Sequence, residues 1–83
     1  MKHRNMVGPQ IRKLRYVSGW SQNILAAKLQ LLGWGTDRVS VAKIELRLVH
    51  VDDYELFYFT RVFNVSLADL FPKIDVARRF TRC

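Results

Sequence analysis

The sequence predicts an all-α fold, a small bundle of about five helices in a single domain. Apolar residues recur three and four positions apart in several segments, the spacing that places them on one face of a helix. Glycine, proline and asparagine stand between these segments, where helices end. With 83 residues, 49% of them hydrophobic, the chain can form one modest core and is too apolar to be disordered.

The first helix is expected to begin at residues 8–9, where Gly8 precedes Pro9. Proline suits the first helical position, because the N–H that it lacks has no partner there. Ile11, Leu14 and Val17 follow at helical spacing and are expected to face inward. The helix ends at residues 18–19, a serine and a glycine.

The second helix is expected to begin after Ser21, whose hydroxyl can cap it. Leu25, Leu29 and Leu32 are spaced so that they share its inner face. The sequence Gly-Trp-Gly at residues 33–35 breaks the helix.

The third helix is expected to be capped by Thr36 or Asp37, with Val41 and Ile44 inward. Residues 46–51 have the composition of a strand. They connect two helices, however, so an extended loop is the preferred interpretation.

The last two helices carry terminal signals. Residues 52–55, Asp-Asp-Tyr-Glu, resemble a capping box. The helix that follows turns Leu56, Phe59 and Phe63 inward, and Asn64 suits a left-handed end. Residues 66–71 predict a further short helix.

The positive charge is concentrated in the first part of the chain. The net charge is +7, and residues 1–51 contain nine lysines and arginines but only two acidic residues, whereas residues 52–83 contain five of each. Such asymmetry favours a polyanionic partner, nucleic acid first and an acidic membrane second. The alternative is a charge that serves only solubility.

Two short helices joined by a tight, glycine-containing turn are typical of a helix-turn-helix. The second of them can enter a major groove about 12 Å wide. On its outer face Arg38 and Lys43 are suited to hydrogen-bond guanine, and Val39 to contact a thymine methyl group. The alternative is that these residues are ordinary solvated surface.

The ordered motifs along residues 7–71 resemble the phage-repressor helix-turn-helix family, of Cro/cI or XRE type. The matching segments are Ile11-Arg12-Lys13-Leu14-Arg15, Gly19-Trp20-Ser21-Gln22, Leu25-Ala26-Ala27-Lys28-Leu29, Val41-Ala42-Lys43-Ile44-Glu45 and residues 56–71. The resemblance implies a lambda-repressor-like DNA-binding domain over residues 7–71, followed by a basic tail over residues 72–83.

The resemblance also implies roles for individual residues. It aligns Arg38, Val39, Ala42 and Lys43 with positions that read bases. It implies that Gln22 binds a DNA phosphate at the N-terminus of the second helix, and that Arg47 and His50 contact phosphates from the loop after the third helix. It also implies a structural ion pair between Arg15 and Glu45.

Two departures from the family pattern affect the geometry. Residues 30–34 add about five residues between the second and third helices, which one extra turn of the second helix would absorb. The loop after Glu45 usually carries a glycine, but Leu46-Arg47-Leu48 has none.

The fourth helix presents a candidate dimer interface. Tyr54, Tyr58 and Arg61 lie four and three residues apart, off the buried row. Further apolar residues are expected either in the core or in this face: Leu31, Trp34, Leu48, Val49, Phe57. Trp20 is expected in the core. A two-fold homodimer would hold its reading helices about 34 Å apart, one turn of DNA.

Several classes of protein are not expected. Motifs of phosphate loops, zinc proteases and serine hydrolases are absent from the sequence, so we expect neither an enzyme nor a cofactor. His3 and His50 have no metal-ligand spacing, and the single cysteine, Cys83, has no partner for an intrachain disulfide. No apolar run is long enough to span a membrane and no secretory signal is visible, so a cytoplasmic location is expected.

These features together predict a transcription regulator, a repressor, that binds double-stranded DNA as a homodimer. One alternative is the antitoxin of a toxin–antitoxin pair, which would also bind a small protein partner. Another is a protein-interaction module that has this fold without DNA binding. A membrane-surface role for the basic ends ranks behind both.

Overall fold

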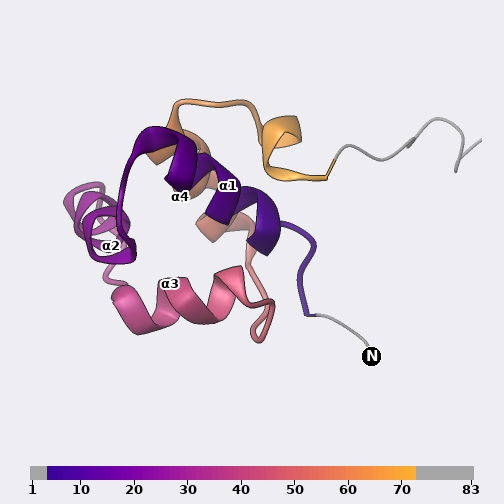
Figure 1. Cartoon of the computed structure of the whole chain (residues 1–83), viewed down its shortest axis with the longest axis horizontal. Coiled ribbons are helices and arrows are strands. Elements are labelled where there is room, and N and C mark those ends of the chain that lie inside the picture. The colour runs from indigo at the N-terminus through magenta and orange to yellow at the C-terminus, as the bar shows by residue number, and fades with distance from the viewer. Residues whose placement is uncertain (1–3, 73–83) are drawn as a thin grey trace, which may run out of the picture.

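The computed structural model describes residues 4–72, which form four α-helices and one 3-10 helix (Figure 1). They are α1 (Gly8–Ser18), α2 (Gln22–Leu31), α3 (Arg38–Glu45), α4 (Asp53–Phe63) and the 3-10 helix η1 (Leu67–Leu70). The predicted all-α fold with five helical elements is confirmed. Residues 46–51 form a loop, so the strand alternative is wrong. Most of the predicted tail, residues 73–83, lies outside the described residues.

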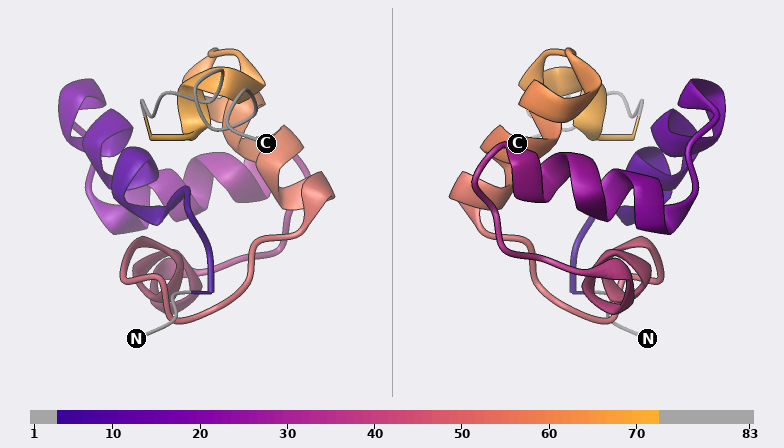
Figure 2. Two further views of the ribbon diagram at one scale, coloured as in Figure 1. Left: turned by 90° about the vertical axis from the view of Figure 1, so that its right-hand side faces the viewer. Right: turned by 90° about the vertical axis from the view of Figure 1, so that its left-hand side faces the viewer.

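The helices surround a small apolar core, and α3 lies along one edge of the bundle (Figures 1 and 2). Side chains from every helix contribute to this core, and they are Val7, Ile11, Leu25, Ala26, Leu29, Val41, Ile44, Phe59 and Leu70. Half-buried aromatic residues extend it, with Trp20 stacked on Phe63 at 5.5 Å between ring centroids. Since α3 packs on this core with one side only, its opposite side is left to solvent.

The helix ends form as the sequence predicts. Gly19 ends α1 in the left-handed conformation, with a φ of 76°, which glycine adopts without steric cost. The Ser21 hydroxyl accepts the Ile24 backbone N–H at 3.1 Å and caps α2. Asp37, rather than Thr36, caps α3 by accepting the Ser40 backbone N–H at 2.8 Å. This hydrogen bond lowers the pKa of the Asp37 carboxyl.

The predicted capping box is present at the start of α4, where the Glu55 carboxylate accepts the Asp52 backbone N–H at 2.9 Å. Asn64 ends this helix with a φ of 55°. The left-handed conformation is tolerated by asparagine better than by most residues. Phe59 is fully buried, and Leu56 and Phe63 pack partly against the core.

Two predicted core positions are wrong. Val17 is 77% exposed, because it lies in the last turn of α1, one residue from the helix end. Leu32 is 38% exposed, because α2 ends at Leu31 and the backbone turns at Gly33, with a φ of 111°. Trp34 packs against the core in its place, with its ring edge-on to Phe59 at 5.3 Å.

Candidate nucleic-acid interface

The exposed face of α3 carries the four predicted base-reading residues. Arg38, Val39 and Lys43 are exposed and Ala42 is half-buried, whereas Val41 and Ile44 on the opposite face are buried. With 3.6 residues per turn, the four side chains fall within an arc of about 140° around the helix. They therefore form one continuous strip on the outer side of α3.

Leu46 extends this strip and was not predicted as part of it. It follows α3 with helical backbone angles, φ −82° and ψ 0°, so its side chain continues the helical arrangement. Its position falls near the middle of the arc occupied by the four residues, and it is 62% exposed. The signal in the sequence was its spacing of four residues from Ala42, which was obscured because residues 46–51 were interpreted as loop.

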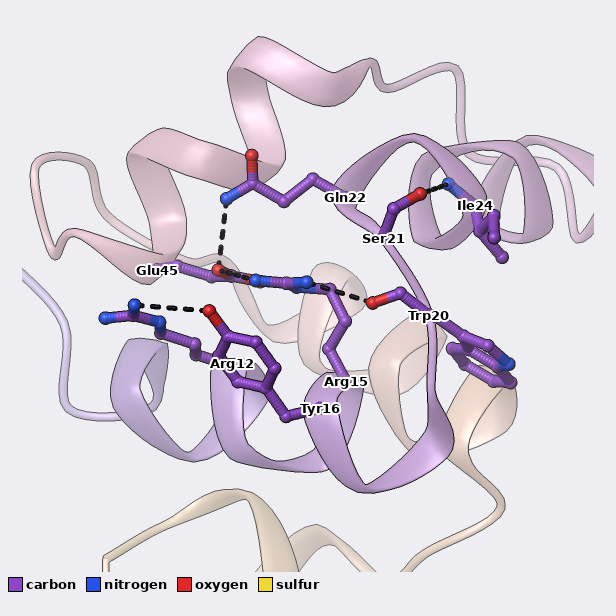
Figure 3. Close-up of polar contacts among 8 residues, drawn as sticks. All are labelled: Arg12, Arg15, Tyr16, Trp20, Ser21, Gln22, Ile24 and Glu45. Carbon is purple, nitrogen blue, oxygen red and sulfur yellow. Dashed lines mark hydrogen bonds and ion pairs between the residues drawn. The ribbon is translucent and has the colours of Figure 1, made fainter.

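A buried ion pair fixes α3 to α1 (Figure 3). The Arg15 guanidinium donates to both carboxylate oxygens of Glu45, at 2.7 and 3.0 Å, and its third hydrogen bond goes to the Trp20 carbonyl oxygen at 2.9 Å. Both side chains are less than one-tenth exposed. The hydrogen bond to Glu45 raises the pKa of Arg15. The ion pair implied by the family resemblance is thus present.

Gln22 joins the same network. Its side-chain amide donates to Glu45 at 3.1 Å, which holds the first residue of α2 beside the end of α3 (Figure 3). The first turn of α2 has backbone N–H groups without helical partners, a favourable place for an anion.

A groove of about 530 Å³ opens between α1, the start of α2 and the end of α3. Its lining includes Arg12 and Tyr16, which were not predicted as site residues. Arg12 donates to the Tyr16 hydroxyl at 3.3 Å (Figure 3), and this hydrogen bond lowers the pKa of Tyr16. Because Gln22 and Leu46 line the same groove, it connects the start of α2 with the exposed strip of α3.

The turn between α2 and α3 is braced from both sides. The Gln30 side chain donates to the Thr36 carbonyl oxygen at 2.6 Å, and the Trp34 backbone N–H donates to the Leu29 carbonyl oxygen at 3.1 Å. Trp34 also stacks on Tyr58 of α4 at 5.9 Å. Of these additional residues Gln30 and Leu31 lie in α2, and residues 32–34 form the anchored turn that leads into α3, so the predicted extra turn of α2 is only partly present.

Arg47 and His50 lie in the loop after α3 and hold the segment that precedes α1. The Arg47 side chain donates from Nε to the Asn5 carbonyl oxygen at 2.9 Å, and His50 Nδ1 lies 3.1 Å from the Arg4 carbonyl oxygen. Asn5 in turn donates to the Val49 carbonyl oxygen at 2.8 Å. The first turn of α1 comes close to the end of α3, since a side chain at Gly8 would collide with the Ile44 carbonyl oxygen. Both residues thus have structural contacts in addition to the predicted phosphate contacts.

Arg47 adopts the left-handed conformation, with a φ of 63°. This is the backbone conformation that glycine adopts without steric cost. We expect Arg47→Gly to have a higher free energy of unfolding than Arg47→Ala by about 1 kcal/mol, because a β-carbon disfavours this conformation. Both variants lose the guanidinium, so urea unfolding of the pair isolates the backbone effect. Equal stabilities would contradict this account.

The predicted dimer residues differ in exposure. Tyr54 is 54% exposed and Arg61 is exposed, with its guanidinium 5.6 Å from the Phe57 ring centre. Tyr58 is half-buried and stacks on Trp34 within the monomer. Of the remaining apolar candidates, Trp34 and Val49 pack against the core, whereas Leu31, Leu48 and Phe57 are exposed. Trp20 is half-buried, as its contact with Phe63 requires.

Within residues 4–72, no group of three histidine, cysteine, aspartate or glutamate side chains is arranged to hold a metal ion. None of the helices in this part of the chain is long and apolar enough to cross a membrane.

The fold defines a class of protein. A helix-turn-helix formed by α2 and α3, within four α-helices and a 3-10 helix, is the lambda-repressor-like fold of the phage-repressor, or XRE, type. The predicted resemblance to this family is confirmed by the fold.

Solved structures give particular examples. The restriction-modification controller protein C.AhdI from Aeromonas hydrophila is similar with a TM-score of 0.68 and 26% sequence identity, over 78% of this chain and 87% of that one. The hypothetical transcription factor NHTF from Neisseria is similar with a TM-score of 0.70 and 21% identity, over 99% of this chain and 86% of that one. No protein-family model matches the chain, and no curated protein sequence matches it significantly. The fold is thus that of transcription regulators and controller proteins.

Proposed function

We propose that this protein is a transcription repressor that binds specific double-stranded DNA sequences with α3 in the major groove. The observation that carries the proposal is the exposed strip on α3, with Arg38 and Lys43 on a helix whose other side is fixed to the core. Arginine and lysine in the major groove hydrogen-bond guanine, and Val39 suits a thymine methyl group. Bound over a promoter, such a domain would repress transcription if it excluded other proteins from the same DNA.

Phosphate contacts would supply the affinity that does not depend on sequence. Gln22 with the first turn of α2 forms one end of the surface, and Arg12 and Tyr16 lie across the groove from it. Arg47 and His50 lie in the loop that follows α3, at the same C-terminal end of the helix that Gln22 adjoins. Phosphate contacts from α1, α2 and this loop would hold that end of α3 in register along the groove, because phosphate contacts position a protein without reading sequence.

We propose that the reader is a homodimer. The exposed side of α4, which carries Tyr54, Phe57 and Arg61, is the candidate two-fold interface. Tyr58 would contribute less than the sequence suggested, since its ring is stacked on Trp34. Two reading helices about 34 Å apart would match half-sites separated by one helical turn of DNA.

The experiment that tests this function titrates the protein into labelled, randomised duplex DNA at several salt concentrations. Fluorescence anisotropy measures the binding, and the bound fraction is sequenced. We expect affinity to fall steeply with salt and a palindrome with half-sites about ten base pairs apart to be enriched. Salt-dependent binding without enrichment would leave a basic domain that contacts phosphates only. Absence of binding would favour a protein-interaction module.

Leu46 gives a separate prediction about base reading. In the enriched site, replacing one thymine by deoxyuridine removes a single methyl group, and we expect this to weaken binding about fourfold where Leu46 contacts it. The Leu46→Ala variant should be insensitive to that replacement, while Val39→Ala keeps the sensitivity at the same base. If Leu46→Ala responds to every such replacement as the parent does, Leu46 does not contact the bases.

A further inference from the structure

A shallow groove of about 290 Å³ lies between the end of α2 and the end of α4, with Trp20 at one side. Its lining is mostly apolar and contains Leu31, Leu32 and Val62 besides Trp20. Leu31 is 88% exposed, more than any other large hydrophobic residue in the described part of the chain. Apolar side chains gathered around a groove mark a site of interaction more often than a scattered surface does.

The groove is a fixed feature rather than a poorly packed part of the core. The Trp20 ring is held by stacking on Phe63 at 5.5 Å. Leu25, Ala26 and Leu29 already supply the buried side of α2, so Leu31 cannot turn inward without displacing that row. The leucine is therefore left for a second molecule to cover.

The margins of the groove are basic. Lys28 lies with its ammonium 4.7 Å from the Trp20 ring centre, and Arg61 lies on the α4 side. No carboxylate lines the groove, and within residues 4–72 the side-chain ion pair is the one between Arg15 and Glu45. Lys28 is therefore available to a carboxylate of another molecule, and so is Arg61 wherever the proposed dimer face of α4 leaves it uncovered.

We propose that this groove binds a short amphipathic segment of another protein, in which aliphatic side chains cover Leu31 and acidic side chains meet Lys28 and Arg61. A second copy of this chain fits poorly, because a two-fold contact through the groove would bring the same two cations together without acids to pair them. The lining residues come from α2 and the residue that follows it, from α4 and from the turn before α2, and none comes from α3. A partner bound there would leave the DNA-reading strip free, and the inference does not depend on DNA binding.

The test uses two labelled helical peptides of the same length. One contains leucine at positions i, i+3, i+4 and i+7 with glutamate on both sides of the leucine row, and its twin has lysine in place of every glutamate. Fluorescence anisotropy with the full chain is expected to show saturable binding of the glutamate peptide, about tenfold tighter than binding of the lysine peptide.

Two variants and one matched control locate the binding. The Lys28→Glu variant should bind the two peptides with about equal affinity. The Leu31→Ser variant should bind the glutamate peptide about tenfold more weakly than the parent chain does. Val17→Ser removes another exposed aliphatic side chain, 77% exposed on α1, and should change nothing. Circular dichroism of each variant checks that the fold is intact.

Three results would overturn the proposal. The first is equal binding of the two peptides by the parent chain, and the second is no saturable binding of either. The third is a lower mass of Leu31→Ser than of the parent in sedimentation, because the groove would then be an interface between copies of this chain.

Discussion

Replacing Glu45 by alanine is expected to lower the free energy of unfolding by about 3 kcal/mol. The substitution leaves the Arg15 guanidinium, with a side chain only 8% exposed, without its carboxylate. Removing one member of a buried ion pair costs about 3–5 kcal/mol. We expect the lower end, because both residues line a groove that opens to solvent. Urea unfolding at neutral pH, followed by circular dichroism, measures the change.

The control for this prediction is the double variant Arg15→Leu/Glu45→Leu, which removes both charges. Its loss of unfolding free energy should be smaller, by about 1–3 kcal/mol, than the sum of the losses for Arg15→Leu and Glu45→Leu alone. Gln22→Ala removes only a neutral donor to Glu45 and should cost about 1 kcal/mol. A Glu45→Ala variant within about 0.5 kcal/mol of the parent would show that this network does not hold α3 in place.

Much of the fold was predictable because its signals are local. Ser21, Asp37 and Asn64 act within three residues of their own positions, so the sequence around each one contains the information. The buried rows of α2 and α3 were predictable from spacing alone. The predicted burial of Val17 and Leu32 was wrong for the opposite reason. Both residues lie where a helix ends, and there periodicity no longer determines which side chain is buried.

The parts of the site that escaped prediction depend on distant contacts. The loop after α3 is held to Asn5, more than 40 residues earlier, through Arg47 and Val49, and no periodic pattern signals such a contact. Leu46 was assigned to a loop together with residues 47–51, because nothing in their composition shows that helical backbone angles continue one residue past the end of α3. Arg12 and Tyr16 had no predicted role in the site, and only the placement of α2 and α3 brings them to a shared groove.

Replacing Arg38 by alanine is expected to cost about 1–3 kcal/mol on the best DNA site, roughly 5- to 150-fold in affinity. Arg38 is exposed at the start of α3, and its carboxylate neighbour Asp37 accepts the Ser40 backbone N–H. The guanidinium is therefore expected to face the DNA and to bind one guanine through two hydrogen bonds. Anisotropy titrations of the selected site and of its three variants at that base pair measure both affinity and discrimination.

Two further variants separate reading from charge. Lys13→Ala removes an exposed cation from α1. It should weaken binding to every DNA sequence by the same factor, without changing the preference at any base pair. Arg38→Lys keeps the positive charge but loses the planar pair of donors, so it should retain the salt dependence of the parent while losing discrimination at one base pair. If Arg38→Lys and Arg38→Ala both preserve the full base preference, the guanidinium contacts phosphate only. The reading role would then belong to Lys43 and the apolar residues of the strip.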